Sequence, residues 1–109
     1  MELNTYQEEA MTTRLETSGI EYMWFNLPGE VGELCSLMAK AYRDGIDNDI
    51  LEENIKKELG DVLWTLTGLI DCYGWSLEDI AKKNLGKLKK RKQEGTLQGS
   101  GDEIGRAHV

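Results

Sequence analysis

The sequence predicts an all-α protein built like a four-helix bundle. Leucine, glutamate and lysine are abundant among its 109 residues, proline occurs once, and helix-start and helix-stop signals recur along the chain. No stretch shows the sustained alternation of apolar and polar residues that would predict a strand. Because so short a chain leaves much apolar surface difficult to bury alone, we expect core helices from two or more subunits.

The first two helices are predicted over residues 5–17 and 20–44. The first begins at a capping-box pattern at Thr5 and ends before Gly19. The second must accommodate Pro28, which has no backbone N–H to donate, so we expect a kink or a restart at that point.

The last two helices are predicted over residues 49–73 and 76–94. Asp49 and Ser76 each start a capping pattern, and Gly74 is the natural stop between the two helices. The connection between the second and third helices is short, which favours antiparallel packing of that pair.

We expect residues 1–95 to form a single α-helical domain and the glycine-rich residues 96–109 to form a tail. The net charge of −7 argues against binding to nucleic acid or to an anionic membrane surface, because both favour a basic protein. The sequence shows no leader segment and no apolar run long enough to span a bilayer, so a cytoplasmic protein is expected.

Two pairs of acidic residues, each with a spacing of three, occur in otherwise apolar stretches. Glu30 and Glu33 lie in "GEVGEL", and Glu58 and Asp61 lie in "ELGDVLW". Residues three apart on a helix are surface neighbours, so each pair presents two carboxylates on one face. If the second and third helices pack antiparallel, the two pairs can approach each other.

Four carboxylates brought together repel one another by about 4 kcal/mol per close pair, unless some are protonated or a cation lies among them. An all-oxygen group of ligands without histidine suits Mg²⁺, with Mn²⁺ possible. The alternative is that these acids only form salt bridges with lysines on ordinary amphipathic helices. Two pairs bordered by apolar residues favour the metal site.

A basic helix contrasts with this acidic background. Between residues 82 and 92 the chain carries seven lysines and arginines and no acid. Asn84, Lys87 and Arg91 lie on one helical face and could bind a polyanion, although cations near a helix C-terminus also complement its dipole. Among the aromatic residues, Trp24 is a candidate for stacking on a base, although burial in a core or interface is the commoner role.

The combined pattern resembles the MazG-type branch of the all-α nucleoside triphosphate pyrophosphohydrolases. The resemblance rests on "LPGEVGEL", "KKELGDVLWTL" and "GWSLEDIAKKNLGKLKKRKQEG", with residues 34–57 as the spacer between the two acidic pairs. It implies a MazG fold and a homodimer or homotetramer. It also implies Mg²⁺-dependent hydrolysis of nucleoside or deoxynucleoside triphosphates to the monophosphate and pyrophosphate, which would clear nucleotide pools.

By the same resemblance, Glu30, Glu33, Glu58 and Asp61 would hold the metal, and one of them would orient or deprotonate the attacking water. Lys40, Asn84, Lys87 and Arg91 would bind phosphates or sugar. The family often has a further acid where this chain has Gly29. A dUTP/dUDP hydrolase or a phosphoribosyl-ATP pyrophosphohydrolase on the same scaffold, and a non-catalytic helical interaction module, are the alternatives.

Overall fold

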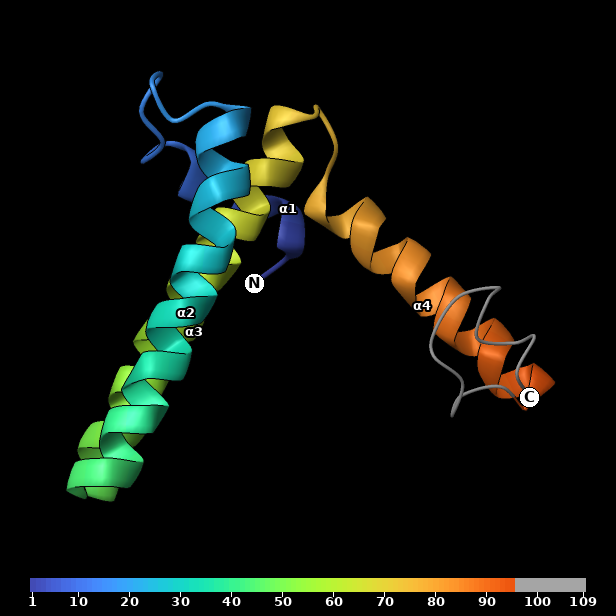
Figure 1. The fold of residues 1–109 in the computed structure, drawn as a ribbon. Coiled ribbons are helices and arrows are strands. Elements are labelled where there is room, and N and C mark those ends of the chain that lie inside the picture. The colour runs from blue at the N-terminus through green and yellow to red at the C-terminus, as the bar shows by residue number, and fades with distance from the viewer. Residues whose placement is uncertain (96–109) are drawn as a thin grey trace. The chain divides into compact units, whose positions relative to one another are not determined.

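The computed structural model describes residues 1–95 and contains four helices in this part of the chain (Figure 1). They are α1 (Leu3–Met11), α2 (Ile20–Asp44), α3 (Asn48–Cys72) and α4 (Leu77–Glu94). The described residues include no strand, which confirms the all-α prediction. The predicted tail, residues 96–109, lies outside the described residues.

The chain divides into two compact units, Met1–Leu77 with α1 to α3 and a second that begins at Glu78 and contains most of α4. The prediction of a single domain over residues 1–95 stays a prediction. Within the described residues, every helix is too short or too polar to cross a lipid bilayer.

The first helix is shorter than the sequence predicts, because α1 ends at Met11 instead of residue 17. The hydroxyl groups of Thr12 and Thr13 donate to the carbonyls of Glu9 and Ala10 at 2.6 Å. Threonine side chains that bond to nearby backbone carbonyls offer the chain an alternative to continued helix. The expected cap at Thr5 is also wrong, since Thr5 lies inside the helix.

The second helix runs without interruption through Pro28, so the predicted restart does not occur. Proline removes only one intrahelical hydrogen bond, and packing of the rest of α2 offsets that loss. The third helix starts one residue earlier than expected, at Asn48, because Asp47 is its cap. The Asp47 carboxylate accepts from the backbone N–H groups of Asp49 and Ile50 at 2.9 and 3.3 Å.

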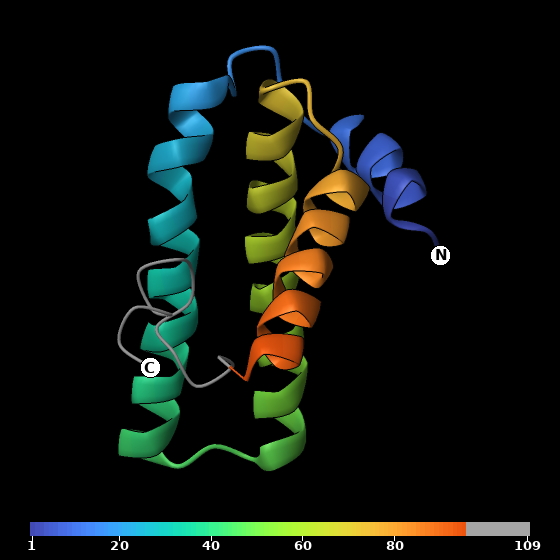
Figure 2. The same ribbon diagram turned by 90° about the vertical axis from the view of Figure 1, so that its right-hand side faces the viewer.

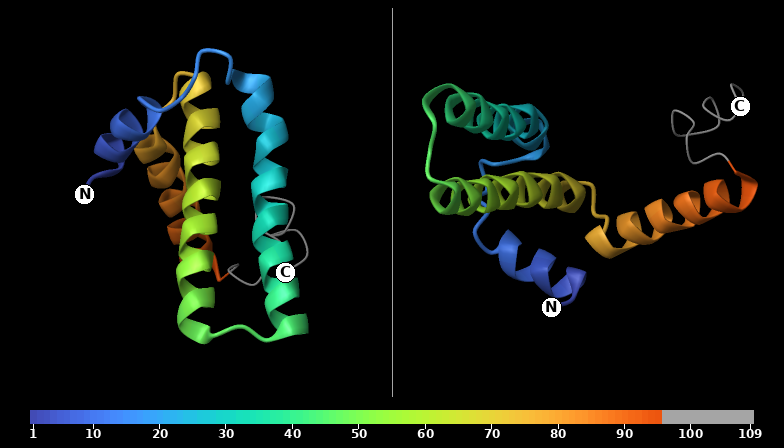
Figure 3. Two further views of the ribbon diagram at one scale, coloured as in Figure 1. Left: turned by 90° about the vertical axis from the view of Figure 1, so that its left-hand side faces the viewer. Right: turned by 90° about the horizontal axis from the view of Figure 1, so that it is seen from below.

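Helices α2 and α3 lie side by side and antiparallel, as the short connection predicts (Figures 2 and 3). On each helix the residues that face the other helix recur at alternating intervals of three and four, which is the heptad spacing of packed helices. On α2 these residues are Met23, Leu27, Glu30, Leu34, Leu37 and Ala41, all buried or half-buried. On α3 they are Leu51, Ile55, Glu58, Val62, Thr65, Leu69 and Cys72, again all buried or half-buried.

Helix α1 packs on a different face of α3, near its C-terminal end. The Trp64 indole donates to the Thr13 hydroxyl at 2.9 Å and to the Ala10 carbonyl at 3.3 Å. Arg14 forms a salt bridge with Asp71 at 3.3 Å. The C-terminal half of α3 is therefore covered on two faces, by α2 and by α1, and it carries most of the buried residues of this unit.

Met23 is the largest fully buried side chain in the described residues, with 0% of its surface exposed. Its side chain packs directly on the backbone of Gly68. The contact is so close that a Cβ added to residue 68 would lie 2.7 Å from Met23 Cε. A side chain at position 68 would therefore displace Met23, and glycine is the residue that allows this close approach.

We expect Met23→Ala to lower the free energy of unfolding by about 2 to 4 kcal/mol, because it removes buried methylene groups and leaves a cavity. Urea unfolding at a fixed protein concentration measures the change. Leu15→Ala is the control, because Leu15 is 68% exposed and its truncation should change stability by less than about 0.5 kcal/mol. Equal losses in the two variants would contradict the importance of the Met23 contact.

Candidate metal centre

Two of the four predicted acids occupy positions where a helix pair normally places apolar residues. Glu30 on α2 and Glu58 on α3 both belong to the heptad rows along which the two helices pack. Both are half-buried. Carboxylates are rarely placed at such positions unless they are paired or bind a metal.

Glu30, Glu33 and Glu58 form a close group. One carboxylate oxygen from each lies within 4.8 Å of the others. At that separation each pair of negative charges repels by roughly 3 to 4 kcal/mol for an effective dielectric of 20. The structure thus brings together three of the four acids that the sequence predicts.

Two oxygens in this group have no hydrogen-bond partner within the described residues. They are Glu30 Oε2 and Glu58 Oε2, and both are shielded from solvent. A buried carboxylate oxygen without a hydrogen bond lowers the stability of the folded state, so such atoms indicate a functional role.

The environment raises the pKa of Glu30 above its ordinary value. Burial of the carboxyl group is the largest cause, and the negative charges of Glu33, Asp61 and Glu58 add to it. A hydrogen bond from Asn26 acts in the opposite direction. A cation bound among these groups would remove the cause of the repulsion.

Asp61 lies outside the group of three but close enough for its charge to act on Glu30. Glu33 and Asp61 each follow a heptad-row acid by three residues, so both lie on the same flank of the antiparallel helix pair. Both side chains are exposed. The acidic group therefore opens to solvent on one flank, where a ligand can reach it.

The opposite flank of the helix pair is apolar. Each of its residues comes directly after a heptad-row residue in the sequence, and all of them are exposed. We call this surface the apolar flank, and it consists of Val31, Cys35, Met38, Leu59, Leu63 and Leu66. The two flanks of one helix pair thus have different chemistry.

Asn26 is a site residue that the sequence analysis missed. Its amide nitrogen donates to Glu30 Oε1 at 3.4 Å and to the Thr65 hydroxyl at 3.1 Å. Thr65 is completely buried on α3. Asn26 is therefore held by Thr65 on α3 while it orients one oxygen of Glu30 on α2. The other Glu30 oxygen, Oε2, stays available to a ligand. The position of Asn26, four residues before Glu30, is the signal that could have found it.

The donor set fits a hard divalent cation. Three carboxylates converge within 4.8 Å, and two of their buried oxygens have no hydrogen-bond partner among the residues that the structure describes. They supply oxygen ligands and negative charge. Glu30, Glu33 and Glu58 would hold the ion, with Asp61 beside them.

The geometry of α2 places Lys40 and Trp24 away from these carboxylates. Lys40 lies ten residues after Glu30, about 15 Å along α2. Trp24 lies six residues before Glu30, about 120° around the helix, and its indole donates to the Tyr73 hydroxyl at 3.0 Å. Their roles in binding substrate stay predictions.

The predicted basic face lies on α4, in the second unit. Asn84 and Lys87 line one surface hollow together with Ile80 and Lys83. Arg91 is half-buried, one helical turn after Lys87. The amide and the cations therefore share one face of α4, as predicted, and their contact with a substrate stays a prediction.

Comparison with known proteins identifies the family of this chain. A model of the MazG nucleotide pyrophosphohydrolase domain matches residues 19–96. The chain belongs to this MazG family. The match spans both acidic pairs and the basic helix, and the all-α fold and the convergent carboxylates agree with a family that generally depends on a divalent metal.

Two proteins of known sequence are similar to this chain. The chain is 34% identical over 113 residues to the Gene 37 protein of Mycobacterium phage L5, covering 94% of this chain and 98% of that protein. It is 37% identical over 70 residues to YvdC of Bacillus subtilis strain 168, described as uncharacterized, covering 57% of this chain and 65% of YvdC. No solved structure matches significantly.

Proposed function

We propose that this MazG protein hydrolyses nucleoside or deoxynucleoside triphosphates to the monophosphate and pyrophosphate, with Mg²⁺ or Mn²⁺, and so clears nucleotide pools in the cytoplasm. The observation that carries the proposal is the group formed by Glu30, Glu33 and Glu58, with two buried oxygens that have no hydrogen-bond partner in the described part of the chain. Family membership supports the choice of a phosphoanhydride as the bond that breaks.

The bound metal ion would neutralise phosphate charge and act as a Lewis acid on phosphate oxygens. Asn26 holds one oxygen of Glu30 in place. One of the four carboxylates accepts a proton from the attacking water. The water oxygen then bonds to phosphorus, the bond between the α- and β-phosphates breaks, and pyrophosphate leaves with the bonding electrons.

The basic face of α4 is proposed to bind the phosphates. Asn84, Lys87 and Arg91 offer an amide, an ammonium and a guanidinium, and the guanidinium can bind phosphate through two parallel hydrogen bonds. Lys40 and Trp24 are proposed to bind substrate as well. A site that grips phosphate through a metal and cations does not need to read the base, so broad base selectivity agrees with this arrangement.

The test is to incubate the protein with each common nucleoside and deoxynucleoside triphosphate and to resolve the products. With Mg²⁺ or Mn²⁺ we expect monophosphate and pyrophosphate in equal amounts, and none after the metal is chelated. Inorganic phosphate and a diphosphate as products would contradict the proposed position of cleavage. The absence of turnover with every nucleotide under both metals would overturn the proposal and favour an interaction module.

Addition of dUTP, dUDP and phosphoribosyl-ATP to this panel separates the related activities. Hydrolysis of dUDP together with dUTP, and of no other nucleotide, would indicate a dUTP/dUDP hydrolase. Hydrolysis of phosphoribosyl-ATP alone would indicate a phosphoribosyl-ATP pyrophosphohydrolase.

A homodimer or homotetramer is also proposed. The apolar flank supports it, because its six side chains are exposed on one chain and are regularly spaced along two parallel rows. An exposed, contiguous apolar surface of this kind marks an interaction site. A second copy presents the same surface, so a two-fold axis would bury both at once.

A further inference from the structure

The flank of the helix pair that carries Glu33 and Asp61 continues beyond these two acids. Each of them follows one heptad-row residue by three positions and directly precedes the next, and four other residues of α2 and α3 do the same. Side chains with this spacing lie along one flank of an antiparallel helix pair. We call this surface the polar flank, and it consists of Asn26, Glu33 and Lys40 on α2 and of Asn54, Asp61 and Gly68 on α3.

Two contacts show which residues of α2 and α3 lie at the same level. The Asn26 amide donates to the Thr65 hydroxyl at 3.1 Å, and Glu33 lies beside Glu58 in the acidic group. Between these contacts α2 advances by seven residues and α3 goes back by seven. The two helices therefore keep a constant register along this flank.

Asn54 and Lys40 lie on the same side of the acidic group. Asn54 is four residues before Glu58, about 6 Å along α3, and Lys40 is seven residues after Glu33, about 10 Å along α2. Because the helices are antiparallel, both displacements point toward the connection between α2 and α3 (Figure 2). Asn54 is half-buried, and its side-chain amide forms no hydrogen bond with another residue of the described chain. A ligand that extends this way from the acids meets first an amide and then an ammonium.

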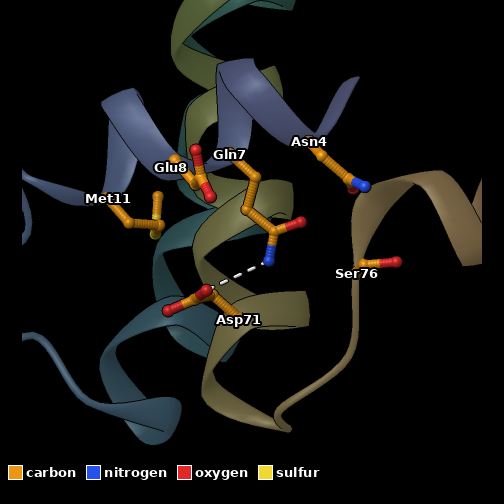
Figure 4. A pocket seen from close by; sticks show the side chains of 6 residues that line it. All are labelled: Asn4, Gln7, Glu8, Met11, Asp71 and Ser76. Carbon is orange, nitrogen blue, oxygen red and sulfur yellow. Dashed lines mark hydrogen bonds between the residues drawn. The ribbon is translucent and has the colours of Figure 1, made fainter. Parts of the chain in front are cut away.

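The opposite end of the polar flank is bordered by α1. Gln7 reaches from α1 to Asp71, and its amide nitrogen donates to that carboxylate at 3.0 Å (Figure 4). The Trp64 indole donates to the Thr13 hydroxyl, just after α1, at 2.9 Å. Trp64 and Asp71 each follow a polar-flank residue by three positions, so α1 lies beside the flank at this end. Within residues 1–77, the flank is thus bordered at one end and open toward the other.

We propose that Asn54 and Lys40 bind the pyrophosphate end of the substrate, the β- and γ-phosphates that leave together, and that the nucleoside lies toward α1. This inference rests on the proposed function and gives the substrate a direction along the polar flank. The Asn54 amide has two N–H donors for phosphate oxygens. The Lys40 ammonium has three donors on a flexible stem, and its charge stabilises the negative charge that the leaving pyrophosphate gains.

The test measures binding of inorganic pyrophosphate to the full chain and so does not depend on turnover. By isothermal titration calorimetry in the presence of Mn²⁺, Asn54→Ala should weaken pyrophosphate binding about tenfold, as expected when a hydrogen bond to a charged group is lost. Lys40→Met should weaken it about tenfold or more, because a full charge is removed. The affinities for Mn²⁺ alone and for a nucleoside monophosphate should stay at their wild-type values.

Asn48→Ala and Lys56→Met are the matched controls. Asn48 is an amide at the start of the same helix, ten residues before Glu58 and about 15 Å from it along the axis. Lys56 directly follows the heptad-row residue Ile55, which places it on the opposite flank, and it pairs with Glu52 at 3.3 Å. Both controls should bind pyrophosphate as tightly as the wild type.

Four results would overturn the inference. Wild-type pyrophosphate affinity in Asn54→Ala would mean that the polyphosphate does not extend in this direction. Weaker binding of the monophosphate alone would mean that the substrate lies the opposite way. An equal loss of Mn²⁺ affinity would mean that the variants act through the metal site. A wild-type protein that does not bind pyrophosphate with Mn²⁺ would also contradict it.

Failure of the proposed function gives a different result. Pyrophosphate binding that depends on Asn54 and Lys40, without turnover of any nucleotide, would remove the proposed hydrolysis and support a polyphosphate-binding flank. Turnover of triphosphates by the wild type together with unchanged pyrophosphate affinity in Asn54→Ala would keep the hydrolysis and remove the assigned direction.

Discussion

Glu58→Gln is expected to abolish turnover and to make the metal-free protein more stable. The substitution keeps the shape of the side chain and removes one of three carboxylates that converge within 4.8 Å. Loss of one metal ligand should lower kcat by about a thousandfold or more, the scale of removing a group that stabilises transition-state charge. Mn²⁺ binding should weaken in parallel.

The expected gain in stability distinguishes the metal site from a structural role. Without metal, the Glu58 carboxylate lies within 4.8 Å of the like charges of Glu30 and Glu33, and its Oε2 atom is buried without a hydrogen-bond partner among residues 1–95. Removing the charge should raise the unfolding free energy by about 1 to 2 kcal/mol, which corresponds to roughly 4 °C or more in Tm for a domain of this size. If Glu58 served the fold through a salt bridge, the same change would lower Tm.

Glu53→Gln is the control for Glu58→Gln. Glu53 is an exposed acid on the same helix, so its neutralisation changes the net charge equally without touching the acidic group. The turnover and the Mn²⁺ affinity of the Glu53→Gln variant should match those of the wild type. Full activity in Glu58→Gln would show that the metal assignment is wrong.

Leu63→Glu is expected to dissociate the proposed oligomer. Leu63 lies in the middle of the apolar flank and is 41% exposed on a single chain. In a two-fold dimer one substitution places two carboxylates in the interface, and burying each unpaired charge costs several kcal/mol. Sedimentation velocity at micromolar concentration should therefore show the mass of a single chain.

Leu15→Glu is the matched control for Leu63→Glu, because Leu15 lies between α1 and α2 and is 68% exposed. This variant should keep the mass of the wild type. If Leu63→Glu also kept it, the apolar flank would not be the interface. A wild-type protein with the mass of one chain would contradict the oligomer itself.

The positions of α2, α3 and α4 were predictable because their signals are local. Gly45 and Gly74 have φ of 69° and 77°, a conformation that glycine adopts at little cost, and each follows the end of a helix closely. The end of α1 was not predictable from its capping pattern. There the hydroxyls of Thr12 and Thr13 compete for backbone carbonyls, and the Trp64 indole holds that turn from a distant helix.

The sequence by itself determined that two acidic pairs would lie on amphipathic helices and approach each other, because a spacing of three places side chains on one helical face. Only the tertiary structure decided the unequal positions of the four acids. The register of α2 against α3 puts Glu30 and Glu58 between the helices and turns Glu33 and Asp61 toward solvent.

The partners of these acids also depended on the tertiary structure. Asn26 reaches Glu30 and Thr65 together only because α2 and α3 pack at this register. Gln7 reaches Leu77 only because α1 folds back on the end of α3. Such contacts join residues far apart in the sequence, and no local pattern of helix spacing encodes them.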